Sequence, residues 1–414
     1  MGILFIYSSG VNAEGILVSN EYVRQIIWAG TGFAAVIILT IVNYRRYYDW
    51  SPYLYAGILI ILVYTAFFGR YINGARRGIG FGGFSIQPAE IAKVITIIFL
   101  ARYLDSTKKD RSSTVRFIIS CFIVLVPMGI ILMQPDLGTA LVFFPILLIM
   151  LYTARFSARY VLFIVFLAAS TIILTMLPYW EQHILKSPRL VFSVLFNSRF
   201  VGLCSIVLSG ILGIALLGYK LYEKKYFFWI SYVIFILLLS LVASFAAHKV
   251  LKEYQIMRLI VFLDPSIDPR GSGWNIIQSM TAIGSGDLFG KGYLRGTHSH
   301  YRFLPEQSTD FIFSIYSEEF GFLGSMLIFG LFMLITYRLT KIMKTTADSF
   351  GIYIISGLIG MYLFHFFINV GMAMGIMPIT GIPLYFMSYG GSALLAAMTG
   401  IGLAMSIFIR RFNR

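Results

Sequence analysis

The feature that most constrains this 414-residue chain is a succession of apolar runs, each about as long as a membrane is thick. A helix needs about 20 apolar residues to cross a bilayer core of about 30 Å. Such runs lie near residues 22–42, 53–69, 88–104, 116–132, 139–153, 159–177, 200–218, 227–247, 311–337, 351–372 and 389–409. Only 12% of the residues are charged, which excludes an ordinary soluble domain. The sequence therefore predicts an all-α polytopic membrane protein with about ten to twelve transmembrane helices.

The positive charge of the chain lies in short loops between these runs. The formal net charge of +15 would suit a nucleic-acid partner, but Lys and Arg occupy alternate loops instead of one basic patch. The clusters lie at residues 45–46, 108–111, 155–159, 220–225, 341–344 and 410–411. The positive-inside rule makes these loops cytoplasmic, so the pattern indicates membrane topology and no nucleic-acid partner. The other loops, 70–87, 133–138, 178–199, 248–310 and 373–388, are then external.

The external segment 248–310 is too long for a mere connector, and loops of this length usually carry function. Its Gly-rich part is no Walker loop, because three residues separate Gly286 from Gly290 and Gly292 follows Lys291. Tight turns are the expected role of these glycines.

The only cysteines, Cys121 and Cys204, lie within apolar runs and indicate neither a disulfide framework nor a zinc site. Residues 1–414 are predicted to form one membrane domain.

Glu90 and Lys93 are charged residues within an apolar run. Glu90 follows Pro88 in the first helical turn, where the helix dipole favours an anion, so it could simply cap the helix. Lys93 lies one turn deeper on the same face, where a lone ammonium in hydrocarbon is costly. Two interpretations stay open: an ion pair that braces the helix, or the lining of a polar substrate cavity. Other polar residues within spans are expected to bond between helices: Glu318, Glu319, His365 and Asn369.

Two aspartates lie at the outer ends of predicted spans. Asp136, in the segment Gln134 to Thr139, could cap the following helix or line the same external site. Asp310 ends a polar segment that contains Glu306 and runs into the apolar run at 311. It could be an N-cap, worth about 1 kcal/mol. Alternatively, partial dehydration raises its pKa toward neutrality, as a general base requires.

These motifs occur in an order that resembles the SEDS family (shape, elongation, division and sporulation), to which RodA and FtsW belong. The resemblance covers nearly the whole chain. It is carried by residues 74–77 with 87–93, 134–139, Arg258 with 262–265, 304–313 and 371–392. Residues 273–286 with Gly296 and Thr297 resemble the RodA branch more than the FtsW branch. That branch acts in cell elongation.

The resemblance implies a peptidoglycan glycosyltransferase that polymerises lipid II at the outer face of the bacterial cytoplasmic membrane and maintains rod shape. It also implies a class B penicillin-binding protein as partner. The family's essential aspartate, in its Leu-Pro-Glu-x-x-Thr-Asp motif, falls on Asp310. Its polar cavity pair falls on Glu90 and Lys93, while Asp136 and Arg258 match further motif positions. Glu306, in the same motif as Asp310, is also expected to line the substrate cavity.

The implied reaction needs one base. The 4-hydroxyl of lipid II attacks the anomeric carbon of the lipid-linked glycan chain, the α-linked pyrophosphate leaves, and a β-1,4 bond forms. We expect Asp310 to accept the hydroxyl proton. Arg77 and Arg258, or a divalent cation (Mg²⁺ or Mn²⁺) that bridges to the pyrophosphate, would offset the charge of the leaving group. No metal site made by the protein itself is predicted.

The sequence also departs from the family pattern. Gly78 and Ser308 stand where the family often has Trp and His. Residues 2–9 look like the end of the family's first span, as if a start codon lay upstream. Residues 179–247 exceed the usual ten-span plan by about one helical pair, which predicts an inserted segment.

Two other functions are compatible with the same residues. A transporter or flippase of lipid II would also place charged residues within its spans. A non-catalytic scaffold for a class B penicillin-binding protein would use the carboxylates only to cap and brace helices. A flippase predicts lipid movement without polymer, and a scaffold predicts that function survives Asp310→Ala.

Overall fold

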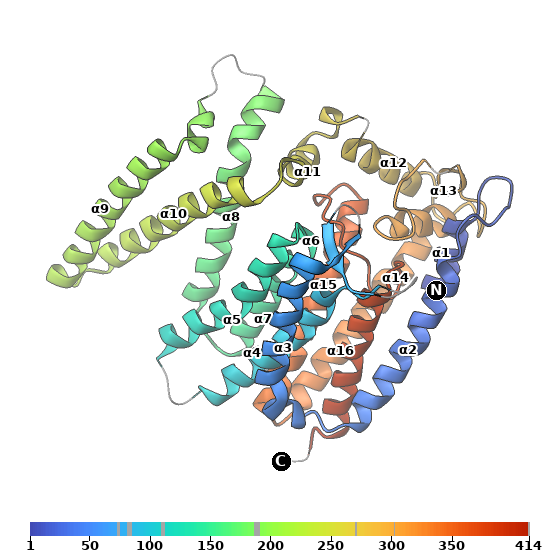
Figure 1. Cartoon of the computed structure of the whole chain (residues 1–414), viewed down its shortest axis with the longest axis horizontal. Coiled ribbons are helices and arrows are strands. Elements are labelled where there is room, and N and C mark those ends of the chain that lie inside the picture. The colour runs from blue at the N-terminus through green and yellow to red at the C-terminus, as the bar shows by residue number, and fades with distance from the viewer. Residues whose placement is uncertain are drawn as a thin grey trace. The chain divides into compact units, whose positions relative to one another are not determined.

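The structure is a computed structural model and describes residues 1–72, 75–80, 85–108, 112–185, 191–269, 271–301 and 303–412 (Figure 1). Every predicted apolar run is helical. Nine described helices are long and apolar enough to cross a membrane. They are α2 (Glu21–Ile41), α3 (Arg46–Phe68), α5 (Ser113–Met133), α8 (Ala158–Trp180), α9 (Ser198–Tyr222), α10 (Lys225–Val250), α14 (Ile312–Thr345), α15 (Ser349–Ala373) and α16 (Gly391–Ile409).

The other two predicted spans are helical but are not among these nine helices. α4 (Pro88–Ser106) carries both Glu90 and Lys93. The run at 139–153 is an apolar stretch of two helices, α6 (Leu137–Leu141) and α7 (Phe143–Thr153). The prediction of an all-α polytopic membrane protein is confirmed.

The remaining described elements are short. They are α1 (Gly2–Gly10), the antiparallel strands β1 (Arg70–Ile72) and β2 (Ala75–Gly78), a π-helical turn (Glu181–Leu185) and a 3₁₀ turn (Phe192–Phe196). The predicted long loop is itself largely helical. It contains α11 (Glu253–Leu263), the 3₁₀ turn Pro265–Ile267, α12 (Ser272–Gly284) and α13 (Thr297–His300).

The chain divides into two compact units. The first comprises residues 1–156 and 270–414, and the second comprises residues 157–269. The second unit contains the predicted inserted segment 179–247, whose assignment as an insertion stays a prediction. Within it α10 packs against α8 and α9, and Thr175 on α8 bonds to Ser244 on α10 (Oγ1 to Oγ, 3.2 Å). Large apolar side chains such as Ile206 are exposed, as a lipid-facing helix requires.

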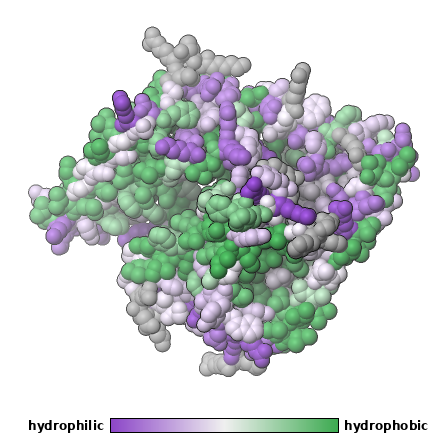
Figure 2. All heavy atoms as spheres, in the orientation of Figure 1, coloured by the Kyte–Doolittle hydropathy of each residue, from purple (hydrophilic) through white to green (hydrophobic). Residues whose placement is uncertain are grey.

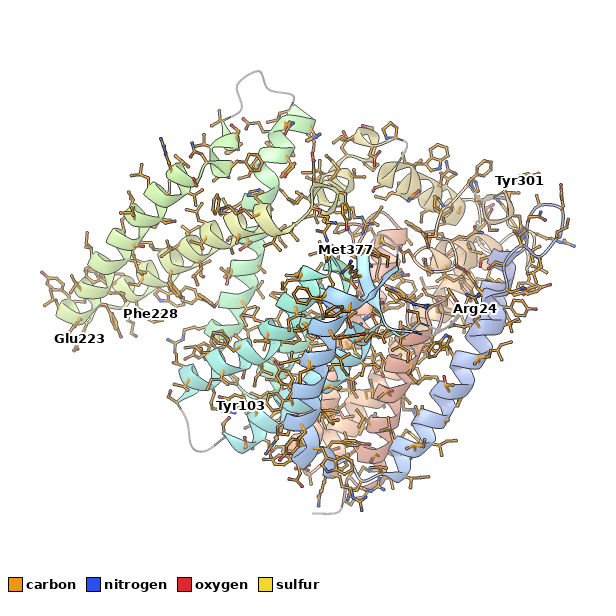
Figure 3. The ribbon with its side chains drawn as sticks, in the orientation of Figure 1. Arg24, Tyr103, Glu223, Phe228, Tyr301 and Met377 are labelled. Atoms are coloured by element: carbon orange, nitrogen blue, oxygen red, sulfur yellow. The ribbon has the colours of Figure 1, made fainter. Side chains whose placement is uncertain are left out.

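The loops of the first unit gather at two ends, as the charge pattern predicts. At one end Arg410 donates to the carbonyl oxygens of Thr40 and Ile41 (3.0 and 2.6 Å), and the Tyr44 hydroxyl bonds to Asp348 (3.1 Å). Lys109 and Arg111 of the basic loops lie outside the described residues, as does Gly74 of the first family motif. Figure 3 shows Tyr103 toward the first end and Met377 toward the second. Between the ends, this face of the unit is largely hydrophobic (Figure 2).

Helix α15 forms the centre of the first unit. It is buried along most of its length and packs against α4, α7, α14 and α16. Glycines permit this close packing, since a side chain at Gly357 would meet Ile97 and Met150, and one at Gly360 would meet the Pro145 carbonyl. The polar side chains of Ser356, His365 and Asn369 on α15 are fully buried and thus shielded from lipid.

Helix α14 is broken near its start at Gly321, where φ is 65° and ψ is −160°. The loop 287–292 bonds to the backbone groups that the break leaves free. Gly290 and Gly292 have positive φ angles (81° and 100°), which confirms the predicted tight turns. The N–H groups of Lys291 and Gly292 donate to the carbonyls of Glu318 and Glu319 (3.0 and 2.9 Å). Satisfied backbone groups of this kind are what a membrane interior demands.

Candidate active site

Asp310 lies in a tight turn that ends at α14. The N-cap of α14 is Phe311, with no side-chain capping bond, so the structure does not support the N-cap interpretation of Asp310. Glu306 shapes the turn. Its φ is 50°, and its carbonyl accepts the N–H groups of Thr309 and Asp310 (3.3 and 3.1 Å). The Glu306 carboxylate is exposed and accepts a bond from Thr309 Oγ1 (3.2 Å), whereas Asp310 is half-buried.

The Asp310 segment is held from three directions. The carbonyl of Ser308 accepts a hydrogen bond from the backbone N–H of Tyr389 (2.8 Å). Gln307 Nε2 donates to the carbonyl of Ser9 in α1 (2.7 Å). The carbonyl of Asp310 itself accepts Nδ2 of Asn369 on α15 (2.8 Å). The predicted base therefore sits on a backbone fixed by distant parts of the first unit.

Glu90 and Lys93 form the predicted i,i+3 ion pair within α4, with 2.8 Å between Oε2 and Nζ. Lys93 also donates to His365 Nε2 and to the Tyr385 hydroxyl, both at 3.0 Å. An ammonium has three N–H donors, and each one here has an acceptor. This explains how a fully buried lysine is tolerated.

The pair lies inside the helix packing, with exposed fractions of 3% for Glu90 and 0% for Lys93. The predicted ion pair is confirmed, while the two interpretations of its role, bracing the helix and lining a substrate cavity, stay predictions. Tyr385 was not identified from the sequence, where nothing distinguishes it among 26 tyrosines. Its hydroxyl donates to Glu90 Oε2 (3.3 Å). Burial, reinforced by the Glu90 carboxylate, raises the pKa of Tyr385 well above its usual value, so it remains a neutral donor.

Asp136 both caps a helix and joins a polar cluster. It accepts the N–H and hydroxyl of Thr139 (3.3 and 2.9 Å), so the capping interpretation is confirmed. Gln87 Nε2 also donates to it (2.6 Å), and Arg77 Nη1 lies 3.9 Å from its Oδ1. Arg77 Nε is buried and has no hydrogen-bond partner within the described chain. Arg77 thus keeps a donor for another acceptor.

Arg258 belongs to the second unit, on the amphipathic helix α11. Its guanidinium lies 5.7 Å from the ring centroid of Tyr254. Its contribution to the site stays a prediction.

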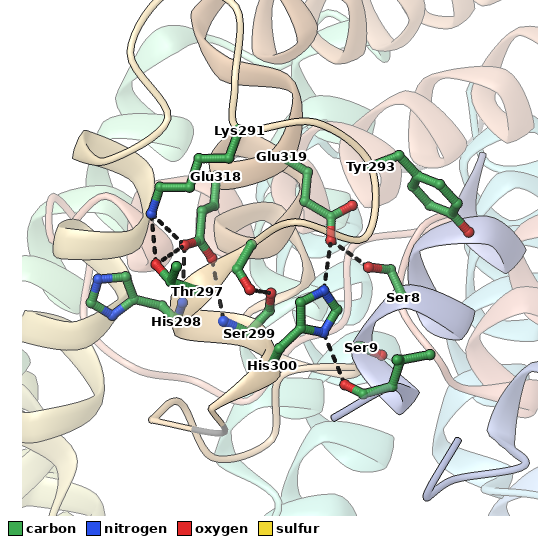
Figure 4. A network of polar contacts seen from close by, with 12 residues as sticks. Ser8, Ser9, Lys291, Tyr293, Thr297, His298, Ser299, His300, Glu318 and Glu319 are labelled. Atoms are coloured by element: carbon green, nitrogen blue, oxygen red, sulfur yellow. Dashed lines mark hydrogen bonds and ion pairs between the residues drawn. The ribbon is translucent and has the colours of Figure 1, made fainter. Parts of the chain in front are cut away.

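The two adjacent glutamates of α14 bond between helices and loops, as expected (Figure 4). Glu318 accepts Lys291 Nζ (2.8 Å), the Thr297 hydroxyl (3.0 Å) and the His298 N–H (2.9 Å). Glu319 accepts the Ser8 hydroxyl, and its Oε1 lies 4.0 Å from His300 Nε2. This network ties α1 and the loop 291–300 to α14.

Residues suited to a metal do not cluster in the described ranges. No group of three or more His, Cys, Asp or Glu side chains there could hold a metal ion. A divalent cation would have to take most of its ligands from a substrate pyrophosphate, and its involvement stays a prediction.

Similar proteins were found over nearly the whole chain. The family model for FtsW, RodA and SpoVE, described as cell cycle protein, matches residues 1–200 and 202–412. The peptidoglycan glycosyltransferase RodA of Treponema pallidum (strain Nichols) is 49% identical over 412 residues, 99% of this chain and 95% of that protein. The peptidoglycan glycosyltransferase MrdB of Escherichia coli (strain K12) is 31% identical, covering 94% of this chain and 85% of its own length.

Solved structures agree with this assignment. A chain of a peptidoglycan synthase complex, described as coordinating polymerization and crosslinking, is 25% identical with a TM-score of 0.65. The alignment covers 100% of this chain and 96% of that one. The crystal structure of the rod shape determining protein RodA of Thermus thermophilus shares the fold, with a TM-score of 0.60 at 22% identity over 100% and 93% of the chains. The chain therefore belongs to the FtsW/RodA/SpoVE family of cell cycle proteins, the SEDS family that its motifs resemble.

Proposed function

We propose that this protein is a peptidoglycan glycosyltransferase of the RodA type that polymerises lipid II during cell elongation. The observation that carries the proposal is 49% identity over 99% of the chain to a protein named as that enzyme. The motif that ends in Asp310 is intact and folds into a turn in which the carboxylate is half-buried.

In the proposed reaction, Asp310 is the general base. It accepts the proton of the 4-hydroxyl of lipid II while the oxygen attacks the anomeric carbon of the lipid-linked glycan chain. The C–O bond to the pyrophosphate breaks, and the lipid pyrophosphate leaves with the electron pair. Arg77 and Arg258 are the candidates that stabilise this anion. The buried Nε of Arg77, which lacks a partner among the described residues, supports its part.

An apolar groove supports a lipid-linked substrate. It lies between α3 and α4 and has a volume of about 390 Å³. Its lining includes Tyr53, Leu54, Gly57, Ile58, Ile61, Ile79, Ile86, Pro88, Ile91 and Ile95. Pro88 directly follows Gln87, which binds Asp136, so the groove and the Arg77–Asp136 cluster meet on α4. An isoprenoid tail would suit this groove, with its pyrophosphate toward the polar cluster.

We also propose that the reaction takes place at the outer face of the bacterial cytoplasmic membrane, with a class B penicillin-binding protein as partner. Within the first unit, the basic segments 45–46, 341–344 and 410–411, which the positive-inside rule makes cytoplasmic, lie at one end. The Asp310 turn lies among the loops that the rule makes external. The peptidoglycan synthase complex to which the chain is similar couples polymerization with crosslinking, which supports such a partner.

Polymerisation of lipid II by the purified protein with its partner transpeptidase tests the proposal. We expect Asp310→Asn to lower the rate by about 10²–10⁴-fold, because a positioned base contributes about that much. Glu14→Gln is the control, since it removes an exposed carboxylate that lies outside the Asp310 motif. Unchanged polymerisation by Asp310→Asn would refute the role of Asp310. Lipid II translocation without polymer by the unmutated protein would favour a flippase, and neither activity would favour a scaffold.

A further inference from the structure

We infer that His365 and Asn369 are positioning residues that couple the buried Glu90–Lys93 pair to the main chain of Asp310. The inference rests on the proposed function, in which Asp310 is the general base. Both residues are fully buried on α15 and lie one helical turn apart, on one face of the helix.

The two side chains bind consecutive carbonyls of the loop between α15 and α16. His365 Nδ1 contacts the oxygen of Pro383 (2.9 Å), and Asn369 Nδ2 donates to the oxygen of Ile382 (2.8 Å). A carbonyl can only accept, so Nδ1 of His365 carries the proton. His365 and Asn369, on successive turns of α15, thus bind the successive carbonyls of Pro383 and Ile382.

Asn369 uses both of its N–H groups. One donates to Ile382 and the other donates to the carbonyl of Asp310 (2.8 Å). A leucine at this position has a similar shape but offers no donor, and an aspartate offers at most one, in its protonated form. The amide therefore holds the peptide of the predicted base against the same loop that His365 holds.

His365 connects this arrangement to the ion pair. Because its Nδ1 is the donor to Pro383, its Nε2 presents a lone pair to Lys93 Nζ (3.0 Å). Lys93 is oriented in turn by Glu90 and Tyr385. A continuous series of contacts runs from Glu90 through Lys93, His365, the 382–383 backbone and Asn369 to Asp310.

Such a series can control the reaction without touching the substrate. Buried polar groups that are hydrogen-bonded make their surroundings rigid. Both N–H donors of Asn369 have acceptors, although its Oδ1 has no partner within the described chain. A catalytic group must be held within about 0.5 Å of its productive position, and a misplacement of about 1 Å can cost about 10²-fold in rate. Asn369 binds the main-chain carbonyl of Asp310, so the expected loss lies in kcat rather than in substrate binding.

The test measures kcat and KM for lipid II polymerisation by the complex with the transpeptidase. We expect Asn369→Asp and Asn369→Leu to lower kcat by about 10- to 100-fold while KM changes less than about threefold. Tyr362→Phe is the matched control. It removes one buried bond from the same helix, the bond of the Tyr362 hydroxyl to the carbonyl of Ala397, and should leave kcat within about twofold.

Substitutions at His365 provide a second measurement with graded outcomes. The amide of His365→Asn can still donate to Pro383 in place of Nδ1, so this variant should keep more of kcat than His365→Phe. Because the residues act as one series, His365→Phe combined with Asn369→Leu should lose no more than about threefold beyond the worse single variant.

The inference fails if Asn369→Leu and Asn369→Asp keep normal kcat while Asp310→Asn is inactive, and the proposed function then stands. It also fails if the Tyr362→Phe control loses as much kcat as the Asn369 variants. Normal activity of Asp310→Asn refutes the proposed base instead. If Asn369→Leu does not fold, the kcat values of the two His365 variants provide the test. A kcat of His365→Asn no higher than that of His365→Phe would then refute the inference.

Discussion

Two glutamate–lysine ion pairs of the first unit, each with a buried carboxylate, have the same N–O distance but different surroundings. Glu90 and Lys93 are 2.8 Å apart, three residues apart in α4, and Lys93 is fully buried. Glu318 and Lys291 are also 2.8 Å apart, but 27 residues separate them, and the Lys291 side chain is 26% exposed. The first pair lies within one helix, whereas the second joins a loop to a helix.

The carboxylates also differ in their other partners. The described contacts of Glu90 are with Lys93 and Tyr385. Glu318 also accepts the Thr297 hydroxyl and the backbone N–H groups of His298 and Ser299. A buried charge that loses its only cation is severely penalised, but one with several neutral donors is partly compensated. The comparison predicts that the two lysines are not equally important.

The largest effect is expected for Lys93→Met. It leaves the Glu90 carboxylate buried without a cation, which typically costs about 3–5 kcal/mol. We expect a matching loss in the free energy of unfolding, measured by denaturation in detergent, together with loss of polymerisation. Lys108→Met is the control, since Lys108 is exposed and its ammonium donates to the Ser349 hydroxyl (3.3 Å). Equal stability of both variants would show that Glu90 needs no cation.

An intermediate effect is expected for Glu318→Gln. The amide keeps one acceptor but loses the charge-assisted bonds to Lys291 and to the 297–299 segment, worth about 1.5–3 kcal/mol. Proteolysis of the loop 291–300 should become faster, because this carboxylate fastens the loop to α14. Unaltered proteolysis would contradict the anchoring role.

The smallest effect is expected for Lys291→Met. Glu318 retains its hydroxyl and backbone donors, and the lysine is partly solvated, so the loss should be about 1 kcal/mol or less. The same denaturation measurement applies. A loss as large as that of Lys93→Met would remove the distinction between the two pairs.

The two pairs also differ in how far the sequence could reveal them. The pair in α4 was predicted, because residues three apart in a helix must share a face. The cap at Asp136 was predicted for a similar reason, since its partner Thr139 lies in the next turn. The bonding of Glu318 between elements was expected, but its partner Lys291 was not. The sequence does not show which residue of a long loop contacts which residue of a helix.

The site around Asp310 shows the same limit. Its motif and its place before an apolar run could be identified, but the sequence left open whether it caps α14. The structure places the cap at Phe311 and binds the Asp310 carbonyl to Asn369, 59 residues away. Tyr385, which contacts Lys93 from 292 residues away, had no local signal.

The sequence by itself determined the membrane character, the helical spans and the alternation of their loops, because hydrophobic length and charge placement act locally along the chain. The order of its motifs determined the family. Only the tertiary structure decided which acceptors surround Lys93 and which side chain holds Asp310. Those contacts depend on how α4, α15 and the loop after α15 pack together, and packing is a property of distant segments rather than of any local pattern.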